Sequence, residues 1–146
     1  MKIEFGGDFE VRKTRDEVYA FLSDPERFCP LLPDFVSLEK DEHAQFLVTL
    51  RVGISHIRGN ARIKMRLAEA SRPSHAVYEG KGDVPGGTTE LRAGFDLTPS
   101  GGGTKVAWSG KSQLSGRLPA LAGGLLEPLA RKNLERLIES LQAALA

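Results

Sequence analysis

The chain has 146 residues, of which 20 are lysine or arginine and 19 are aspartate or glutamate, so its formal net charge at pH 7 is only +1. This balance argues against a binding surface for nucleic acid or for an anionic membrane. The single cysteine, Cys29, excludes an intramolecular disulfide and a cysteine-based zinc site. No apolar run approaches the roughly 18 to 20 residues that a transmembrane helix needs.

No linker-like stretch rich in proline, glycine or serine divides the sequence, so residues 1–146 are expected to form one domain. Met1 leads directly into a predicted strand, without the charged and apolar regions of a signal peptide. A cytoplasmic location is therefore expected.

The first predicted element is a strand with one wet and one buried face, because its apolar residues alternate with charged ones. The apolar positions are Ile3, Phe5, Phe9 and Val11. Thr14 and Glu17 form a capping box at the start of a short helix. Asp24 and Pro25 then start a second short helical turn, in which Asp24 is the predicted cap.

Six further strand-like segments follow without another helix between them. They are Phe35 to Lys40, Phe46 to Val52, Arg58 to Leu67, Ala76 to Gly82, Thr88 to Leu97 and Thr104 to Leu114. Turn signals separate them, among them Gly53 and two glycine-rich stretches. Arg62, Lys64 and Arg66 alternate with apolar residues, and we interpret them as a solvated sheet face rather than a phosphate-binding stripe.

The chain ends in a long amphipathic helix with charged residues opposite its apolar stripe. The stripe contains Leu118, Leu121, Ala122, Leu125, Leu126, Leu129, Ala130, Leu134, Leu137, Ile138 and Leu141. Pro128 cannot donate a hydrogen bond to the carbonyl of Gly124, so either a kink or the end of a short preceding turn is expected near Gly123 and Gly124. Residues 118–126 should then be the least firmly held part of the helix.

A helix of this length needs an apolar surface, which the strand-rich middle of the chain provides. The expected fold is α+β: a curved seven-stranded antiparallel sheet wrapped around the C-terminal helix, with two short helices after the first strand. Such an arrangement tends to leave a cavity between sheet and helix. Trp108, Phe95, Met65 and Leu125 share the inward parity or the helix stripe and should be substantially buried.

Glycines occupy four inward positions of the predicted sheet, namely Gly59, Gly80, Gly82 and Gly110. Two explanations are open. Glycines allow a long sheet to coil sharply around a helix, and they also leave volume in which a ligand can lie.

Catalytic groups are sparse. His43, His56 and His75 lie in or near predicted turns and have no partner at metal-ligand spacing. Cys29 is flanked by apolar residues and is interpreted as a core residue rather than a nucleophile. We expect no metal site, no cofactor and no acid/base pair.

Short motifs along nearly the whole chain carry a family resemblance. They are Phe9-Glu10-Val11, Val18-Tyr19-Ala20-Phe21-Leu22 with Asp24-Pro25-Glu26-Arg27, Leu31-Leu32-Pro33, Val52-Gly53-Ile54 with Gly59, Gly80-Lys81-Gly82, Leu97-Thr98-Pro99, Ser115-Gly116-Arg117-Leu118, Leu125-Leu126 and Ala130-Arg131-Lys132. With these motifs the chain resembles the START/Bet v 1-like helix-grip (SRPBCC, polyketide cyclase-like) superfamily, and within it the CoxG family of carbon monoxide dehydrogenase subunits. It departs from the family at Asp34, where a glycine is common.

The resemblance implies a helix-grip fold and a non-enzymatic role: binding of an apolar or amphipathic small molecule, such as a lipid or quinone, and assistance to a molybdenum hydroxylase of the carbon monoxide dehydrogenase type. A ligand of this kind should contact Phe28, Leu32, Ile54, Tyr78, Phe95, Trp108, Leu121 and Leu125. It should enter where the turn from Gly53 to Gly59 meets residues 118–126.

Two alternatives stay open. Helix-grip relatives include cyclases and aromatases, and an enzyme of that kind needs polar residues inside, for which Tyr78, Ser112 and His56 are the candidates. A protein-interaction module with a filled core is the other alternative. The volume and polarity of the interior distinguish these hypotheses.

Overall fold

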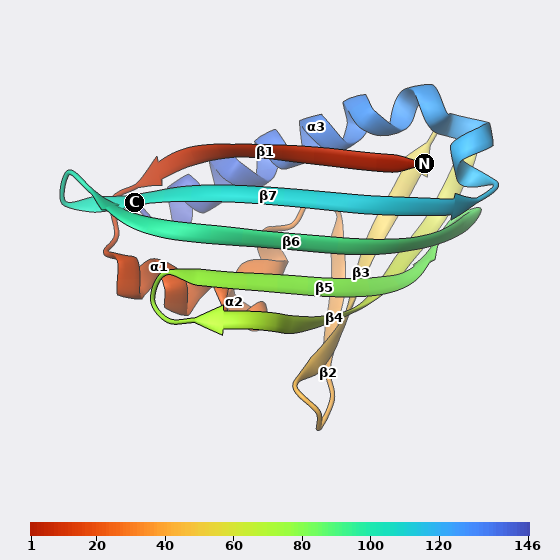
Figure 1. Cartoon of the computed structure of the whole chain (residues 1–146). Helices are drawn as coiled ribbons and strands as arrows, with labels where there is room; N and C mark the ends of the chain where they lie inside the picture. Colours follow the sequence, from red (N-terminus) through yellow and green to blue (C-terminus); the bar gives the residue numbers. More distant parts are fainter.

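The computed structural model describes all 146 residues, and its elements follow the order expected from the sequence (Figure 1). The elements are β1 (Lys2–Val11), α1 (Arg15–Leu22), α2 (Pro25–Phe28), the short 3₁₀ turn η1 (Cys29–Leu31), β2 (Phe35–Lys40), β3 (Gln45–Ile54), β4 (Ile57–Ser71), β5 (His75–Val84), β6 (Gly87–Ser100), β7 (Gly103–Gly116) and α3 (Leu118–Ala144).

All strands belong to one seven-stranded antiparallel sheet, in the order β1-β7-β6-β5-β4-β3-β2. Figure 1 shows β2 and β3 running steeply across the direction of β1 and β7, so the sheet is strongly curved. The long helix α3 runs along one face, and α1 and α2 lie at one end of the strands. This confirms the predicted α+β helix-grip architecture.

The cross-strand register places the apolar parity of every long strand on the face that α3 covers, here called the inner face. Phe9 pairs with Val106 across β1 and β7, and Val106 pairs with Leu97 across β7 and β6. Val106 and Leu97 are almost fully buried, whereas Glu10 and Lys105 on the opposite parity are exposed. The period-2 pattern therefore predicted the correct face.

Both predicted helix caps are present. The Thr14 side chain accepts a hydrogen bond from the Glu17 N–H (3.4 Å), and Asp24 Oδ1 accepts one from the Glu26 N–H (3.0 Å). Asp34, after η1, has a φ of 61°, in the left-handed region that glycine adopts without steric cost. This backbone requirement explains why a glycine is common there, and aspartate is one of the few other residues that tolerate it.

The turn expected at Gly53 is displaced. Gly53 lies within β3, and the chain reverses at Ser55 and His56, so that Ile54 pairs with Ile57. Ser55 supplies the positive φ of this turn, at 55°. The glycine signal was misleading because the pairing of two isoleucines on either side of the turn extends the hairpin past Gly53.

Both ends of α3 are held by backbone hydrogen bonds. The N–H groups of Arg117 and Leu118 donate to the carbonyl oxygen of Gly86 (2.7 and 2.9 Å), in the turn between β5 and β6. After the helix, the carbonyl oxygen of Leu145 accepts from the N–H groups of Arg12 and Lys13 (3.1 Å each). The helix is thus fixed to the sheet at its two ends.

The irregularity expected in this helix is found at Ala122, one residue before the glycine pair. Ala122 has φ −135° and ψ 15°, whereas Pro128 lies inside the helical segment. This fits the prediction of a kink near Gly123 and Gly124. Despite its length, α3 is not apolar enough to qualify as a membrane-spanning helix.

Candidate functional site

Two clusters of buried side chains fill opposite ends of the space under α3. The main core contains 17 buried residues, including Val18, Tyr78 and Phe95, and lies toward α1 and α2. The second cluster lies under the start of α3. Its buried members are Ile3, Ile54, Leu114, Leu118, Ala122 and Leu126.

Between the two clusters, the inner face of β5, β6 and β7 carries small residues. On β7 they separate Trp108 from Leu114, and on β5 they separate Tyr78 from Val84. We call this group the small-residue floor. It consists of Gly80, Gly82, Thr89, Ala93, Gly110 and Ser112.

The floor is not tightly covered by the helix above it. Ala93 and Ser112 are only half-buried although they face α3, and so is Leu91, which lies in their midst. Leu134, in the middle of α3, is also half-buried and does not pack on either cluster. The centre of the interior is therefore less densely filled than its two ends.

The glycines of the floor have different neighbours. A Cβ on Gly80 would lie 2.1 Å from Met65 Sδ, so the Met65 side chain occupies that space. A Cβ on Gly82 would lie 2.0 Å from the carbonyl oxygen of Arg62, so only glycine fits against that backbone. At Gly110 a Cβ would meet only Ala93 Cβ at 3.8 Å and one backbone oxygen at 4.0 Å. Close packing thus explains Gly80 and Gly82, and Gly110 alone leaves free space.

Aromatic residues close the end of the floor that faces α1 and α2. The ring of Tyr78 lies 5.5 Å from that of Phe28 and 5.9 Å from that of Phe46, and Tyr19 meets Phe95 edge-on at 6.1 Å. The Tyr78 hydroxyl donates a 2.7 Å hydrogen bond to the carbonyl oxygen of Leu22. Burial raises the pKa of Tyr78, so this hydroxyl is neutral at physiological pH and acts as a structural anchor.

Trp108 stands beside this group on β7, opposite Phe95 on β6. Its indole lies across Gly7 of β1, where an added Cβ would be 3.4 Å from Cζ2 and 3.5 Å from Nε1. The Trp108 Nε1 atom is buried and has no hydrogen-bond partner. It is the one buried side-chain donor of the molecule in that condition.

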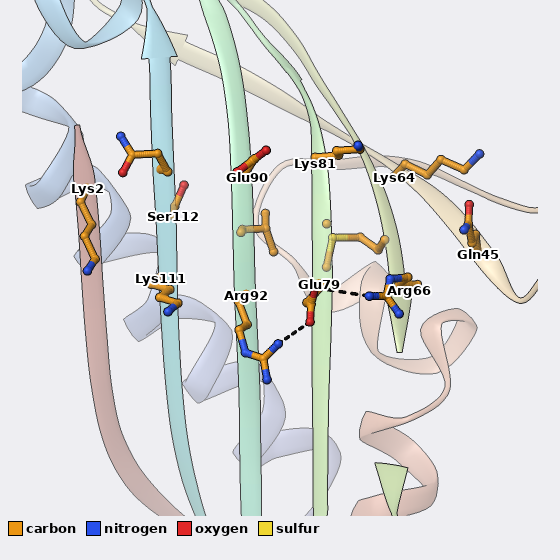
Figure 2. Close-up of a pocket in the computed structure, with 14 residues that line it drawn as sticks. Lys2, Gln45, Lys64, Arg66, Glu79, Lys81, Glu90, Arg92, Lys111 and Ser112 are labelled. Atoms are coloured by element: carbon orange, nitrogen blue, oxygen red, sulfur yellow. Dashed lines mark hydrogen bonds and ion pairs between the residues drawn. The ribbon is translucent and has the colours of Figure 1, made fainter. Parts of the chain in front are cut away.

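The outer face of the sheet is polar by contrast. A hollow of about 760 Å³ lies there, and of its 14 lining residues only Met65 and Leu91 are apolar. Figure 2 shows the strands with α3 behind them and the charged side chains of Arg66, Glu79 and Arg92 on the near side. Glu79 pairs with both arginines. The interpretation of this parity as a solvated face is confirmed by its exposure and its ion pairs.

A model of the CoxG family of carbon monoxide dehydrogenase subunits matches residues 7–146. The chain belongs to this family. No curated protein sequence gives a significant match.

Several solved structures resemble this CoxG-family chain. A conserved protein from Geobacillus kaustophilus has a TM-score of 0.85 and 20% identity, covering 98% of this chain and 95% of its own. The protein TTHA0849 from Thermus thermophilus has a TM-score of 0.70 and 19% identity, covering 97% and 95%. The Zhui aromatase/cyclase from Streptomyces sp. R1128 has a TM-score of 0.72 and 13% identity, covering 99% and 93%. At these identities the likeness establishes the fold.

The structure groups five of the eight residues expected to contact a ligand. Tyr78 and Phe95 belong to the main core, and three others pack against it while remaining half-buried. Those three are Phe28, Leu32 and Trp108. Ile54 belongs to the second cluster instead, where it lies with Leu118 and Leu126.

Leu121 and Leu125 do not lie in the interior, because 65% and 52% of their surfaces are exposed. The expected burial of Leu125 was therefore wrong. Leu118, Ala122 and Leu126 are the residues of this segment that face the sheet. The burial predicted for Phe95 is confirmed, whereas Trp108 and Met65 are on the inner face but only partly buried.

The three polar residues on which an enzyme would depend do not converge. His56 is exposed in the turn between β3 and β4, and the Ser112 hydroxyl is hydrogen-bonded to Thr89 Oγ1 (2.8 Å). The Tyr78 hydroxyl is already bonded to the backbone of α1. Cys29 is buried, and desolvation raises the pKa of its thiol to about 12, as suits a core residue. The structure contains no group of three metal-binding side chains.

Sequence reasoning missed the relation between Trp108 and Gly7. Both residues were assigned to the inner face, but alternation along a strand does not say which residues of two distant strands pair. The pairing of β1 with β7 brings them together across about 100 residues of sequence. A glycine at an inward position of the first strand was the only available signal.

Proposed function

We propose that the protein binds an apolar or amphipathic small molecule, of lipid or quinone type, between the inner face of the sheet and α3. The observation that carries this proposal is the small-residue floor, which lies half-buried under the helix between two packed clusters. Sites for small molecules are mostly apolar and have few polar groups, and this region has that character. Membership of the CoxG family supports a role in binding rather than catalysis.

In this proposal Phe28, Leu32, Ile54, Tyr78, Phe95 and Trp108 surround the ligand. Leu121 and Leu125 are exposed, so we place them where the ligand enters. The nearby contact between Ile57 and the second cluster joins the turn between β3 and β4 to the first part of α3. Movement of this part of the helix about Ala122 is the proposed route of access.

The second part of the proposal is an accessory role toward a molybdenum hydroxylase of the carbon monoxide dehydrogenase type. It is supported by the family description. The test is to mix the protein with its cognate purified hydroxylase and to measure complex formation by sedimentation velocity. A change in sedimentation that depends on both proteins supports the role, and independent sedimentation at tens of micromolar argues against it.

Ligand binding is tested first by native mass spectrometry of the purified protein, followed by solvent extraction of any bound molecule. We expect an adduct that disappears on extraction. If no adduct is found, the protein is titrated with a set of long-chain lipids and quinones. Failure of all of them to bind would favour an interaction module with a filled core.

The position of the site is tested with Gly110→Leu, because the added side chain would occupy the free space above the floor. Ala107→Leu is the matched control, since it adds a similar side chain to the exposed outer face of the same strand. A ligand that binds only the folded state raises the melting temperature by mass action. Gly110→Leu should abolish that rise and Ala107→Leu should preserve it. A folded Gly110→Leu variant with the full rise would show that the ligand binds elsewhere.

A further inference from the structure

The interior of the protein contains one polar group whose hydrogen bond is missing. Trp108 Nε1 is buried without an acceptor, whereas the other buried side-chain polar atoms all have partners. Tyr78 donates to Leu22, and Thr89 and Ser112 bond to each other. A buried indole N–H normally finds an acceptor, because leaving it unpaired costs the full desolvation of the donor.

This donor lies next to the proposed site. Trp108 and Gly110 are consecutive inner-face positions on β7, about 7 Å apart along the strand. Gly110 is the floor glycine above which space is free. On the other side, Gly7 lets the indole lie flat over β1, and a larger residue there would press on its edge. The ring is thus held at the margin of the free space.

The surroundings also restrict the charge of a ligand. The inner-face positions of β5, β6 and β7 carry no charged side chain. The nearest cation toward β1 is Arg131 of α3, whose guanidinium lies over the Phe5 ring at 5.0 Å. Arg131 is exposed and already pairs with Glu127. A buried carboxylate would therefore lack a counter-charge, which makes its desolvation very unfavourable.

We propose that Trp108 is a specificity-determining residue of the ligand site: its Nε1–H donates a hydrogen bond to a neutral carbonyl-type oxygen of the ligand, while the apolar remainder lies over the small-residue floor. This inference rests on the proposed function and narrows the ligand to neutral carbonyl compounds, with carboxylates and plain hydrocarbons disfavoured.

The test uses three probes of similar size: 2-acetylnaphthalene, 2-ethylnaphthalene and 2-naphthoate. The first carries a neutral carbonyl, the second has no acceptor and the third is charged. Affinities are measured by calorimetry with the natural protein and with protein in which tryptophan is replaced biosynthetically by benzothienylalanine. Because Trp108 is the only tryptophan, this replacement removes one N–H and nearly preserves the shape of the ring.

We expect the ketone to bind most tightly to the natural protein and to lose roughly tenfold in affinity when the N–H is removed, as the loss of one hydrogen bond implies. The ethyl compound should bind equally to both proteins. Trp108→Phe provides a second variant without the donor. In the natural protein, the single indole ¹H–¹⁵N resonance should move downfield with the ketone and not with the ethyl compound.

Two results would overturn the inference and leave the proposed function intact: equal affinities of all probes for both proteins, or tighter binding of the naphthoate than of the ketone. Absence of binding by every probe, together with no extracted ligand and no binding of the lipids and quinones, would overturn the proposed function and this inference together. The two failures are therefore distinguishable.

Discussion

At the scale of single residues, the glycines of the inner face show why one residue type serves two purposes. Gly82 lies so close to the carbonyl of Arg62 that a Cβ would be 2.0 Å from the oxygen. Gly110 meets nothing closer than 3.8 Å. The first glycine permits a close approach of two strands, and the second leaves space above the sheet.

This difference predicts opposite effects of alanine at the two positions. Gly82→Ala should lower the free energy of unfolding by about 1 to 3 kcal/mol, because the backbone must shift to relieve the overlap. Gly110→Ala should be neutral or raise it by up to about 1 kcal/mol, since glycine in a strand is entropically unfavourable. Urea denaturation of both variants measures the effects, and a more stable Gly82→Ala would contradict the packing described here.

His75 is the titratable residue with the most specific surroundings. Its Nε2 lies 3.0 Å from a Glu69 carboxylate oxygen and its Nδ1 lies 2.8 Å from one of Asp96. Hydrogen bonds to Glu69, and then to Asp96, raise the pKa of His75 above its usual 6.5. Because the folded state binds this proton more tightly, the imidazole contributes stability below pH 6.5 that is lost as the pH rises through the folded-state pKa.

We therefore expect His75→Gln to be more destabilising at pH 5.5 than at pH 9. The comparison stays above pH 5, because the pKa of Glu69 is itself lowered from 4.5 and its carboxylate must remain ionised. His43→Gln, in the exposed turn between β2 and β3, is the matched control. Thermal melts at both pH values check the effect, and a loss that does not depend on pH would show that the proton plays no part.

At the scale of elements, α3 is fixed at its ends and unevenly packed between them. Its first part is held by Gly86 and its end by the Leu145 carbonyl. The irregular backbone at Ala122 separates a short first segment from the main helix. Leu121 and Leu125, on either side of this irregularity, are exposed, whereas Leu129 packs on the second cluster.

The uneven packing predicts unequal costs of truncation. Leu129→Ala should lower the free energy of unfolding by about 2 kcal/mol, at the lower end of the range for packed leucines because Leu129 is half-buried. Leu125→Ala should change it by less than about 0.5 kcal/mol, since an exposed side chain loses few contacts. Denaturant melts with Leu125→Ala as the worse variant would mean that this segment packs in solution against the sheet or another chain.

At the scale of the whole molecule, the fold persists at low sequence identity. The Geobacillus kaustophilus protein shares 20% of residues over nearly the full chain and still superposes with a TM-score of 0.85. Alternation of apolar and polar residues can be kept with many different side chains, so the sheet and the helix survive extensive substitution. The identity of the residues around the floor is free to vary, and ligand preference with it.

The local features of this protein were determined by its sequence. Alternation in β1 to β7 predicted the correct face because the side chains of a strand alternate whatever it pairs with. Thr14 and Asp24 marked helix starts because a cap bonds to the backbone two or three residues away. The order of these elements was sufficient to predict a sheet wrapped around the last helix.

Only the tertiary structure decided the details of the candidate site. The position of Trp108 over Gly7, the sulfur of Met65 above Gly80 and the exposure of Leu125 depend on register between distant strands and on the rotation of α3. Alternation is the same for every register that shifts by two residues, and a wide helix stripe allows several rotations. Long-range packing selects one of them, and with it the unpaired donor of Trp108 and the free space above Gly110.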